Sequence, residues 1–256
     1  MLRKSLLTLA VVITLLFPAG RTEAAQLKLL VGGAMTEPIK KVGADFSRKT
    51  STKLDVTTNT TGALQGLLRK GEKADIIIVS APGMDALEKE KLVVPGTRVD
   101  LARGLVGVGV RAGAASPDLS SPEAFKKAIL AARSISYVDP KAGGTSGTYM
   151  AGLFQRMGIA AEVSKKTVFR NQGSEVADAV AKGEAEIGIT FTSELIPNKG
   201  VKVAGTLPAT IQLPTNYVAA IPVGASNPDA ARAFIKELKA PAGQAAIREA
   251  GLEPIP

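Results

Sequence analysis

The sequence predicts an α/β protein whose sheets are mixed and mostly parallel. From Gln26 onward, short apolar runs alternate with amphipathic helical stretches, and this alternation is typical of repeated strand–helix–strand units. The run DIIIV at residues 75–79 is almost wholly apolar, as expected of a strand buried on both faces. Apolar residues make up 45% of the 256 residues, so a packed core is expected rather than disorder.

The individual elements follow from apolar spacing and from end signals. In segment 37–48, Ile39, Val42 and Phe46 share one helical face, and Pro38 suits the first turn. The predicted strands are 27–31, 54–57, 75–79, 105–110, 134–138, 168–169 and 186–191, and segments 201–204 and 217–222 are expected to be extended. The predicted helices are 37–48, 63–69, 82–91, 121–132, 146–157, 174–182, 228–239 and 242–250.

Residues 1–25 have the three-part layout of a secretory signal peptide. Arg3 and Lys4 form a basic head, residues 6–17 are a mostly apolar run, and small residues follow, so cleavage is expected after Ala24 or Ala25. The run is shorter than the roughly 20 residues that span a bilayer, which disfavours an uncleaved anchor. No Cys follows it, so a lipoprotein anchor is excluded. We therefore expect the mature protein in a bacterial periplasm.

The composition excludes several kinds of chemistry. The chain contains no Cys, His or Trp. Disulfides, zinc sites built on Cys or His, and Cys–His or Ser–His–Asp nucleophiles are therefore impossible. The net charge is +9, but the basic residues are scattered and aromatic residues are only 4% of the chain, so no nucleic-acid partner is expected. We expect neither a metal nor a cofactor.

Four loops that follow predicted strands are rich in Gly, Ser, Thr or Asn and lead into predicted helices. They span residues 32–36, 58–62, 139–148 and 170–174. Glycine lets a ligand approach the backbone, and hydroxyls and free N–H groups at helix starts donate hydrogen bonds. Each loop alone is also what an ordinary helix cap looks like. Because ligands of α/β sheets lie at the carboxyl ends of strands, convergence of these loops would create an anion site.

The loop sequences GGAMT, TNTTGAL, ADIIIVSAP and VDPKAGGTSGTY resemble those of the periplasmic molybdate-binding protein family, over about residues 27–252. Members of that family are solute receptors of ABC importers with the type II periplasmic-binding fold. The resemblance implies two lobes with a ligand cleft between them. Lobe one would hold residues 26–104 and 221–256, and lobe two residues 105–220.

The resemblance also implies ligand-binding positions, which fall in this chain on Ala34, Thr61, Ser146, Gly173 and Phe191. The family holds its oxyanion with uncharged hydroxyls and backbone amides. Ala34 and Phe191 lack the hydroxyl expected at their positions, and a buried polar group without a partner costs roughly 1–3 kcal/mol. Nearby threonines would have to compensate for these losses; the candidates are Thr36, Thr60, Thr145, Thr148, Thr190 and Thr192.

Arg170 offers an alternative ligand class, because it lies beside the fourth loop and an arginine binds carboxylates through two parallel hydrogen bonds. If its side chain enters the cleft, an organic di- or tricarboxylate is favoured over molybdate or tungstate. If it pairs with an acidic residue on the surface, it says nothing about the ligand.

The leading functional hypothesis is a monomeric transport receptor that closes around a small anion and delivers it to a membrane permease of an ABC importer. A molybdate- or tungstate-like oxyanion is the leading ligand, and an organic di- or tricarboxylate is the alternative. An exported enzyme is a weaker alternative, because Asp75 and Asp139, the acids nearest the loops, are expected to have structural roles in capping or turns. A periplasmic sensor that presents its closed form to a signalling protein would use the same scaffold. We expect binding without catalysis.

Overall fold

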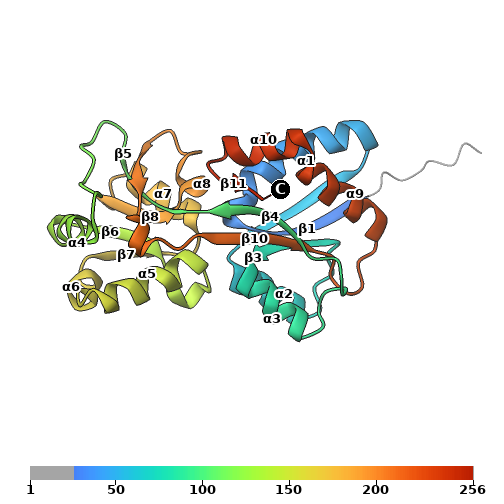
Figure 1. The fold of residues 1–256 in the computed structure, drawn as a ribbon, viewed down its shortest axis with the longest axis horizontal. Coiled ribbons are helices and arrows are strands. Elements are labelled where there is room, and N and C mark those ends of the chain that lie inside the picture. Colours follow the sequence, from blue (N-terminus) through green and yellow to red (C-terminus); the bar gives the residue numbers. More distant parts are fainter. Residues whose placement is uncertain (1–25, 256) are drawn as a thin grey trace, which may run out of the picture.

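The computed structural model describes residues 26–255, so the predicted signal peptide at residues 1–25 lies outside the described part of the chain. The elements form two lobes side by side, each built on one mixed sheet (Figure 1). We refer to them as the six-stranded lobe and the five-stranded lobe. The predicted α/β class is confirmed.

The six-stranded lobe has the strand order β11-β4-β10-β3-β1-β2. Its strands are β1 (Gln26–Gly32), β2 (Lys53–Asn59), β3 (Ile76–Ser80), β4 (Val99–Gly104), β10 (Thr215–Ala220) and β11 (Glu253–Pro254). Its helices are α1 (Thr36–Thr50), α2 (Thr61–Arg69), α3 (Ala81–Lys89), α9 (Pro228–Lys239) and α10 (Pro241–Glu249). Figure 1 shows α1, α9 and α10 on one face of the sheet and α2 and α3 on the other. The parallel strands β1, β2 and β3 all end at the same edge, toward the five-stranded lobe.

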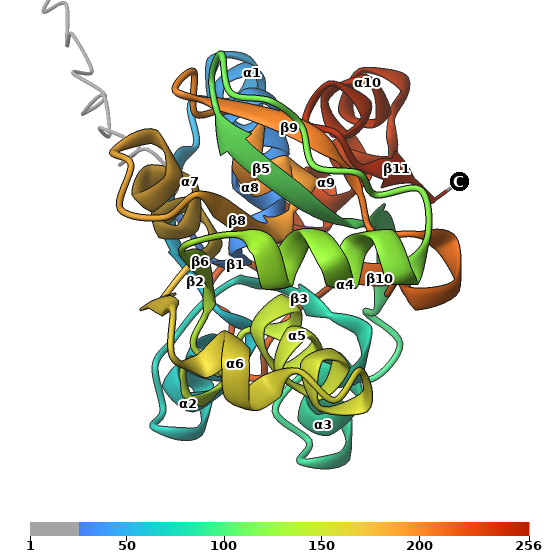
Figure 2. The ribbon, with the colours of Figure 1, turned by 90° about the vertical axis from the view of Figure 1, so that its left-hand side faces the viewer.

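The five-stranded lobe has the strand order β7-β6-β8-β5-β9 and faces the viewer in Figure 2. Its strands are β5 (Val106–Arg111), β6 (Ile135–Val138), β7 (Thr167–Arg170), β8 (Ile187–Phe191) and β9 (Val201–Thr206). Its helices are α4 (Pro122–Ala131), α5 (Thr145–Arg156), α6 (Ala160–Ser164), α7 (Gly173–Ala181) and α8 (Thr192–Leu195). The 3₁₀ turns are η1 (Gly33–Met35), η2 (Pro140–Ala142) and η3 (Ala209–Ile211).

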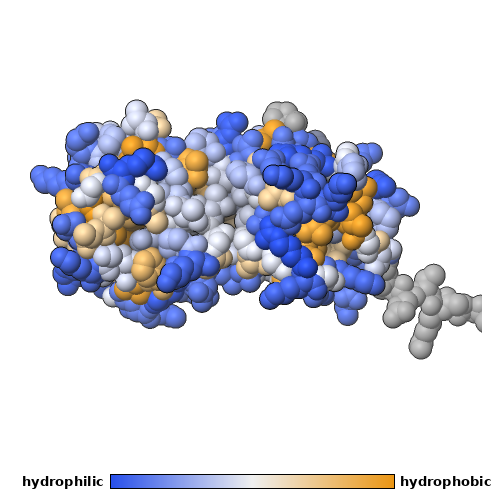
Figure 3. Space-filling view, turned by 90° about the horizontal axis from the view of Figure 1, so that it is seen from below, coloured by the Kyte–Doolittle hydropathy of each residue, from blue (hydrophilic) through white to orange (hydrophobic). Residues whose placement is uncertain are grey.

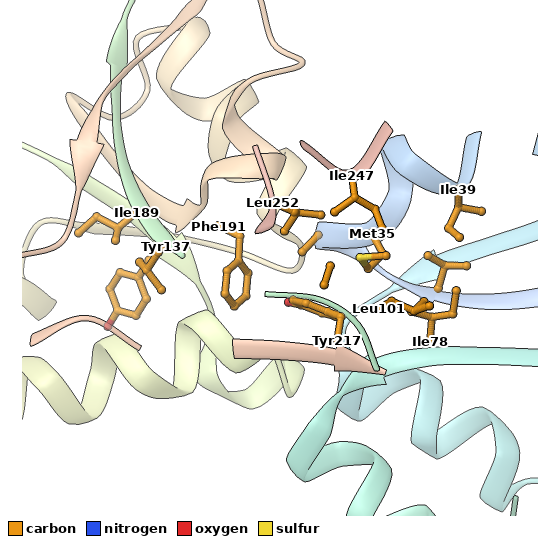
Figure 4. Close-up of a cluster of buried hydrophobic side chains, with 14 of the residues drawn as sticks. Met35, Ile39, Ile78, Leu101, Tyr137, Ile189, Phe191, Tyr217, Ile247 and Leu252 are labelled. Atoms are coloured by element: carbon orange, nitrogen blue, oxygen red, sulfur yellow. The ribbon is translucent and has the colours of Figure 1, made fainter. Parts of the chain in front are cut away.

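The local patterns of the sequence explain the best-predicted elements. All five residues of β3 are buried, as its apolar run predicts. In α1 the predicted apolar face is buried, and Phe46 packs edge to face on Phe234 with ring centroids 5.2 Å apart. Figure 4 shows that buried side chains continue from this lobe, through Tyr217 and Phe191, to Ile189 in the other. The core therefore connects the two lobes.

Two chain segments cross between the lobes. One is Leu105, the single residue between β4 and β5, and the other is segment 207–214, between β9 and β10. The Gln212 side chain joins the two crossings, because it accepts a hydrogen bond from Val106 N and donates one to Val106 O, both at 3.0 Å. These crossings are the positions where a hinge between the lobes would lie.

The predicted boundary between the lobes at residues 220 and 221 is one strand too late. Strand β10 was expected in lobe two, but it pairs antiparallel with β3 and β4 in the six-stranded sheet. Strand β4 was not predicted, because its sequence VDLARG places Asp100 and Arg103 on the surface and lacks a continuous apolar run. The short helices α6 and α8 were also missed.

The lobes touch directly at two glycines. Gly62 N donates a hydrogen bond to Gly143 O at 3.0 Å, and Thr60 Oγ1 donates one to Ala142 O at 2.5 Å. A Cβ atom on Gly62 would lie only 2.9 Å from the Gly143 Cα. The structure is therefore a closed form that requires a residue without a side chain at this contact. Figure 3 shows the lobes as two rounded bodies that meet at a junction of intermediate hydropathy.

Among residues 26–255, no helix has both the length and the apolar character needed to cross a bilayer.

We predict that Gly62→Ala opens the two lobes, because the new methyl group collides with the Gly143 backbone and backbone atoms move little. Small-angle scattering of the ligand-free protein should show a larger radius of gyration than the wild type. Gly66→Ala, in the same helix, is the control, because a Cβ there meets nothing within 4 Å. It should leave the scattering unchanged and raise the free energy of unfolding by about 0.5–1 kcal/mol. An unchanged radius for Gly62→Ala would contradict the closed contact.

Candidate functional site

A small cavity lies where the two lobes meet. It has a volume of about 30 Å³, which is space for about one or two water molecules. Both lobes contribute to its wall, and it includes five positions predicted from the sequence: Ala34, Thr61, Ser146, Gly173 and Phe191. We refer to this space as the inner cavity. The predicted loops therefore do converge on one place.

Helix starts bring free backbone donors to the inner cavity. Helices α5 and α7 begin beside it, and their N-cap residues, Gly144 and Gln172, make no side-chain capping bond. The N–H groups of a helix's first turn have no partner inside the helix and carry partial positive charge. In contrast, Thr60 caps α2 by accepting a bond from Ala63 N at 3.2 Å. The two uncapped starts can therefore donate to an anion in the cavity.

Hydroxyl groups connect the lobes beside the same cavity. The buried Ser80, at the end of β3, accepts a hydrogen bond from Thr61 Oγ1 at 3.3 Å and one from Thr145 Oγ1 at 3.2 Å. On the other side, Ser146 Oγ lies 3.4 Å from Thr190 Oγ1. These hydroxyls are alternative donors for a ligand, since each can rotate away from its present partner.

The carboxyl group of Glu194 forms part of the wall and was not anticipated. Thr190 Oγ1 donates a hydrogen bond to Glu194 Oε2 at 2.5 Å. A Cβ on Gly33 would lie 2.3 Å from Glu194 Oε1, and one on Gly173 would lie 2.0 Å from Oε2. The carboxyl is thus packed against backbone from both lobes, and only glycine at these two positions leaves room for it.

Partial burial of Glu194 determines the charge state of its carboxyl group. It raises the pKa of Glu194 from 4.5 to about 7, although the hydrogen bond from Thr190 and a backbone hydrogen bond at Phe191 partly oppose the rise. Burial, together with the charge of Glu194, also raises the pKa of Tyr217 well above its ordinary value. Near neutral pH the site therefore contains a carboxyl that both donates and accepts protons readily, beside a phenol that stays neutral.

Tyr217 provides a phenol beside the position where the sequence has lost one. Its ring lines the inner cavity and packs edge to face on Phe191, with centroids 5.6 Å apart (Figure 4). Phe191 itself has no hydroxyl. The polar group at this end of the site therefore comes from β10 of the six-stranded lobe rather than from β8.

A second, more open cavity of about 500 Å³ adjoins the inner one and shares Gly33, Gln172 and Glu194 with it. We refer to it as the outer cavity. Thr36, a predicted site residue, lines this space, and its Oγ1 lies 3.4 Å from Thr58 Oγ1. Glu194 therefore borders both spaces.

Arg170 is not at either cavity. It ends β7, where it forms an ion pair with Glu184 and donates a hydrogen bond to Phe169 O at 2.9 Å. Its position therefore gives no support to a carboxylate ligand. The sequence placed Arg170 at the correct edge of the sheet but gave no information on the direction of its side chain.

The other polar candidates have separate positions. Thr60 and Thr145 line the inner cavity, whereas Thr148 is exposed and Thr192 donates a hydrogen bond to Gly251 O at 2.9 Å.

Asp75 has the structural role expected of it, since its carboxylate accepts hydrogen bonds from the backbone N atoms of Lys28 and Asn227. Asp139 likewise accepts one from Lys141 N.

The sequence matches the family model of bacterial extracellular solute-binding proteins over residues 27–253. The chain belongs to this family. A relative from Pseudomonas sp, named aconitate isomerase, is 31% identical over 236 residues, which are 90% of this chain and 88% of the relative. The molybdate-binding protein ModA of Azotobacter vinelandii is 24% identical over 237 residues, which are 90% of each chain.

Among solved structures, the periplasmic molybdate-binding protein of Azotobacter vinelandii has a TM-score of 0.74 at 20% identity, covering 90% of this chain and 99% of that one. The resemblance to periplasmic molybdate-binding proteins and the type II periplasmic-binding fold are both confirmed. The chain is a solute-binding protein of the ABC-transporter type.

We predict that Glu194 makes the ligand-free protein less stable as the pH rises. The folded state holds the proton up to about pH 7, whereas the unfolded chain releases it near 4.5. The penalty is therefore absent below pH 4.5, grows between these values and is complete above pH 7, where it amounts to about 3 kcal/mol. Glu194→Gln cannot ionise, so it should be more stable than the wild type at pH 8 and similar at pH 4.5.

Urea unfolding at several pH values tests this, with the exposed Glu184→Gln as the matched control, which should retain the wild-type slope. Equal pH dependence in Glu194→Gln and the wild type would show that the buried carboxyl does not titrate as described.

Proposed function

We propose that the protein is a periplasmic receptor that captures a small organic di- or tricarboxylate between its lobes and delivers it to the membrane permease of an ABC importer. It acts as a monomer, and closure of the lobes encloses the ligand. The observation that supports this ligand class best is the Glu194 carboxyl in the wall of the inner cavity. The relative named aconitate isomerase adds support for an organic acid.

A metal oxyanion fits this wall poorly. Molybdate is a dianion without protons at neutral pH, so every group that holds it must be a hydrogen-bond donor. Ala34 and Phe191 have no donor side chain, and an ionised Glu194 would repel the ligand. Two unit charges 4 Å apart interact by about 4 kcal/mol at an effective dielectric constant of about 20. Only the protonated form of Glu194 would help, and it supplies a single donor.

A carboxylate ligand fits the same wall better. Two carboxyl groups that share one site can hold a single proton between them, and the resulting hydrogen bond is short and charge-assisted. The uncapped starts of α5 and α7 and the hydroxyls of Thr61 and Ser146 supply the other donors. An anion near Glu194 raises its pKa further. Binding should therefore take up a proton from solution near pH 7 and above.

We predict that calorimetry detects tricarboxylate binding accompanied by proton uptake at pH 7.5, measured as a dependence of the binding enthalpy on the buffer. The affinity should fall between pH 6 and pH 8.5, because the uptake is required for binding. Glu194→Gln should abolish both the uptake and most of the pH dependence. Arg170→Ala should bind as the wild type does, since Arg170 is outside the cavities. Tighter binding of molybdate or tungstate than of any carboxylate would refute the proposal.

Isomerisation of the bound acid is a second candidate function, and Glu194 is the observation that favours it. An acid–base catalyst works best when its pKa is close to the working pH, and burial holds the pKa of Glu194 at about 7. Aconitate interconverts between its cis and trans forms when one proton leaves the methylene carbon and another is added to the vinylic carbon, while the double bond shifts. A single ionised carboxyl that faces both carbons can accept the first proton, exchange it with solvent and donate a proton to the second carbon.

We predict that, if the protein is also an isomerase, it interconverts cis- and trans-aconitate, measured by proton NMR, and incorporates deuterium at carbon in heavy water. Glu194→Gln should then lose at least about 10²-fold in rate, the usual contribution of a general acid–base group. Glu184→Gln should keep full activity. If wild-type protein binds aconitate stoichiometrically without turnover, the protein is a receptor without catalytic activity, as the sequence predicts.

A further inference from the structure

The hydroxyl group of Tyr217 is a donor without a partner in the described part of the protein. Tyr217 is only 3% exposed and lines the inner cavity. No residue within 26–255 forms a hydrogen bond with its hydroxyl, although a buried tyrosine hydroxyl usually has a partner. In the same range, Ser193 Oγ is the one fully buried side-chain oxygen or nitrogen without a partner. The Tyr217 oxygen is therefore not sealed in the core, and it opens on the inner cavity.

Two glycines fix the direction of the Tyr217 ring. A Cβ on Gly32 would lie 3.3 Å from Tyr217 Cε1, and one on Gly104 would lie 3.3 Å from Cε2. These two ring carbons flank the carbon that bears the hydroxyl. The ring also packs edge to face on Phe191, and Figure 4 shows the hydroxyl pointing toward the five-stranded lobe. Because the backbone of β1 and β4 already holds the phenol in this direction, ligand binding orders it at little cost in entropy.

An anion in the inner cavity has to be held by neutral donors. Among the described residues of its wall there is no Lys or Arg, and only Glu194 and Tyr217 can titrate. Burial and the nearby charge of Glu194 raise the pKa of Tyr217 well above its ordinary value, so the phenol keeps its proton in the neutral range. The cavity has room for about one or two water molecules, so an acidic group that enters it lies against this wall.

We propose that the Tyr217 hydroxyl donates a hydrogen bond to the ligand carboxylate that occupies the inner cavity. The inference rests on the proposed function for the class of ligand. This donor supplies, from β10, the hydroxyl that Phe191 lacks at the end of β8. A bond from a neutral phenol to a carboxylate is charge-assisted, so it contributes more than a bond between two neutral groups.

Tyr217 and Glu194 make different contributions to binding. The pKa of Glu194 is about 7, so its hydrogen bond to the ligand depends on pH. The Tyr217 hydroxyl stays protonated over the same range, so its contribution is the same at pH 6 and at pH 8.5. The pH dependence of the affinity therefore distinguishes the two donors.

Tyr217→Phe tests the contact, because it removes the hydroxyl and keeps the ring. With tricarballylate as the probe, calorimetry should show binding weakened about ten- to hundredfold, which is the effect of losing a hydrogen bond to a charged group. The factor should be the same at pH 6 and at pH 8.5. Tyr137→Phe is the matched control and should bind as the wild type does, because Tyr137 is a buried tyrosine that packs on Phe154 outside both cavities.

Tyrosine absorption is a readout that a purely structural role would not change. The chain contains three Tyr and no Trp, so its near-ultraviolet spectrum reports mainly on these residues. A phenol that donates a hydrogen bond to a carboxylate absorbs at longer wavelength. Tricarballylate should therefore shift the spectrum of the wild type and of Tyr137→Phe, but not that of Tyr217→Phe. The ligand-free Tyr217→Phe should unfold at the wild-type midpoint or above, since the lost hydroxyl has no partner in the protein.

Wild-type affinity in Tyr217→Phe, an undiminished spectral shift, a loss of affinity that differs between the two pH values, or a lower unfolding midpoint would each overturn the contact. If the wild type binds neither tricarballylate nor succinate, the proposed ligand class fails together with the contact. That outcome is distinct from a failure of Tyr217 alone, in which the wild type binds these acids and the variant binds them equally well.

Discussion

The central constraint on this molecule is the partial burial of the Glu194 carboxyl where the two lobes meet. A carboxylate removed from water is costly unless donors surround it or a proton neutralises it. Glu194 has one hydroxyl donor, Thr190, and lies against the backbone at Gly33 and Gly173. The donors are too few for full ionisation at low cost, so the group keeps its proton up to about pH 7. A negatively charged ligand in the same cavity must therefore accept a hydrogen bond from the protonated carboxyl of Glu194.

The fold creates this site because two separate sheets end at one junction. Strands β1 and β2 lead into loops from one lobe, and β6, β7 and β8 lead into loops from the other. The chain passes between the lobes only at Leu105 and at segment 207–214, so a hinge between the lobes would lie there. The contact between Gly62 and Gly143 holds them together without side chains. Access to the site and burial of Glu194 are therefore controlled by the same closure.

Sequence reasoning predicted the parts of the fold and site that depend on local pattern. The face of α1 and the run of β3 were predictable because periodicity alone determines which residues are buried. The loops that contain Thr61, Ser146 and Gly173 were predicted because ligands lie at strand ends in such folds, and the family resemblance then indicated these three positions within the loops. Strand β10 was assigned to the wrong lobe because it pairs with β3 and β4, which are more than 100 residues away in the sequence, and local patterns do not predict such pairing. Tyr217 lies on β10 and was missed for the same reason.

The position of Glu194 at the site could have been predicted from the sequence. It follows β8 in the segment TFTSEL, a strand end that leads into a short helix, as the other loops do. It was not predicted as a site residue because an anion site is expected to contain hydroxyl and amide donors rather than a carboxylate. Because Glu194 lies in the site, anion binding depends on how the Glu194 proton is shared with the ligand as well as on the number of hydroxyl donors.

The difference between a receptor and an isomerase then depends on which atom of the ligand faces Glu194. If a carboxylate oxygen faces it, the proton is shared between two acids and the result is binding that depends on pH. If an allylic carbon faces it, the same proton exchange becomes a reaction at carbon. The fold is common to both outcomes and favours neither. The orientation depends on how the rest of the ligand is held by the donors of the two lobes around Glu194.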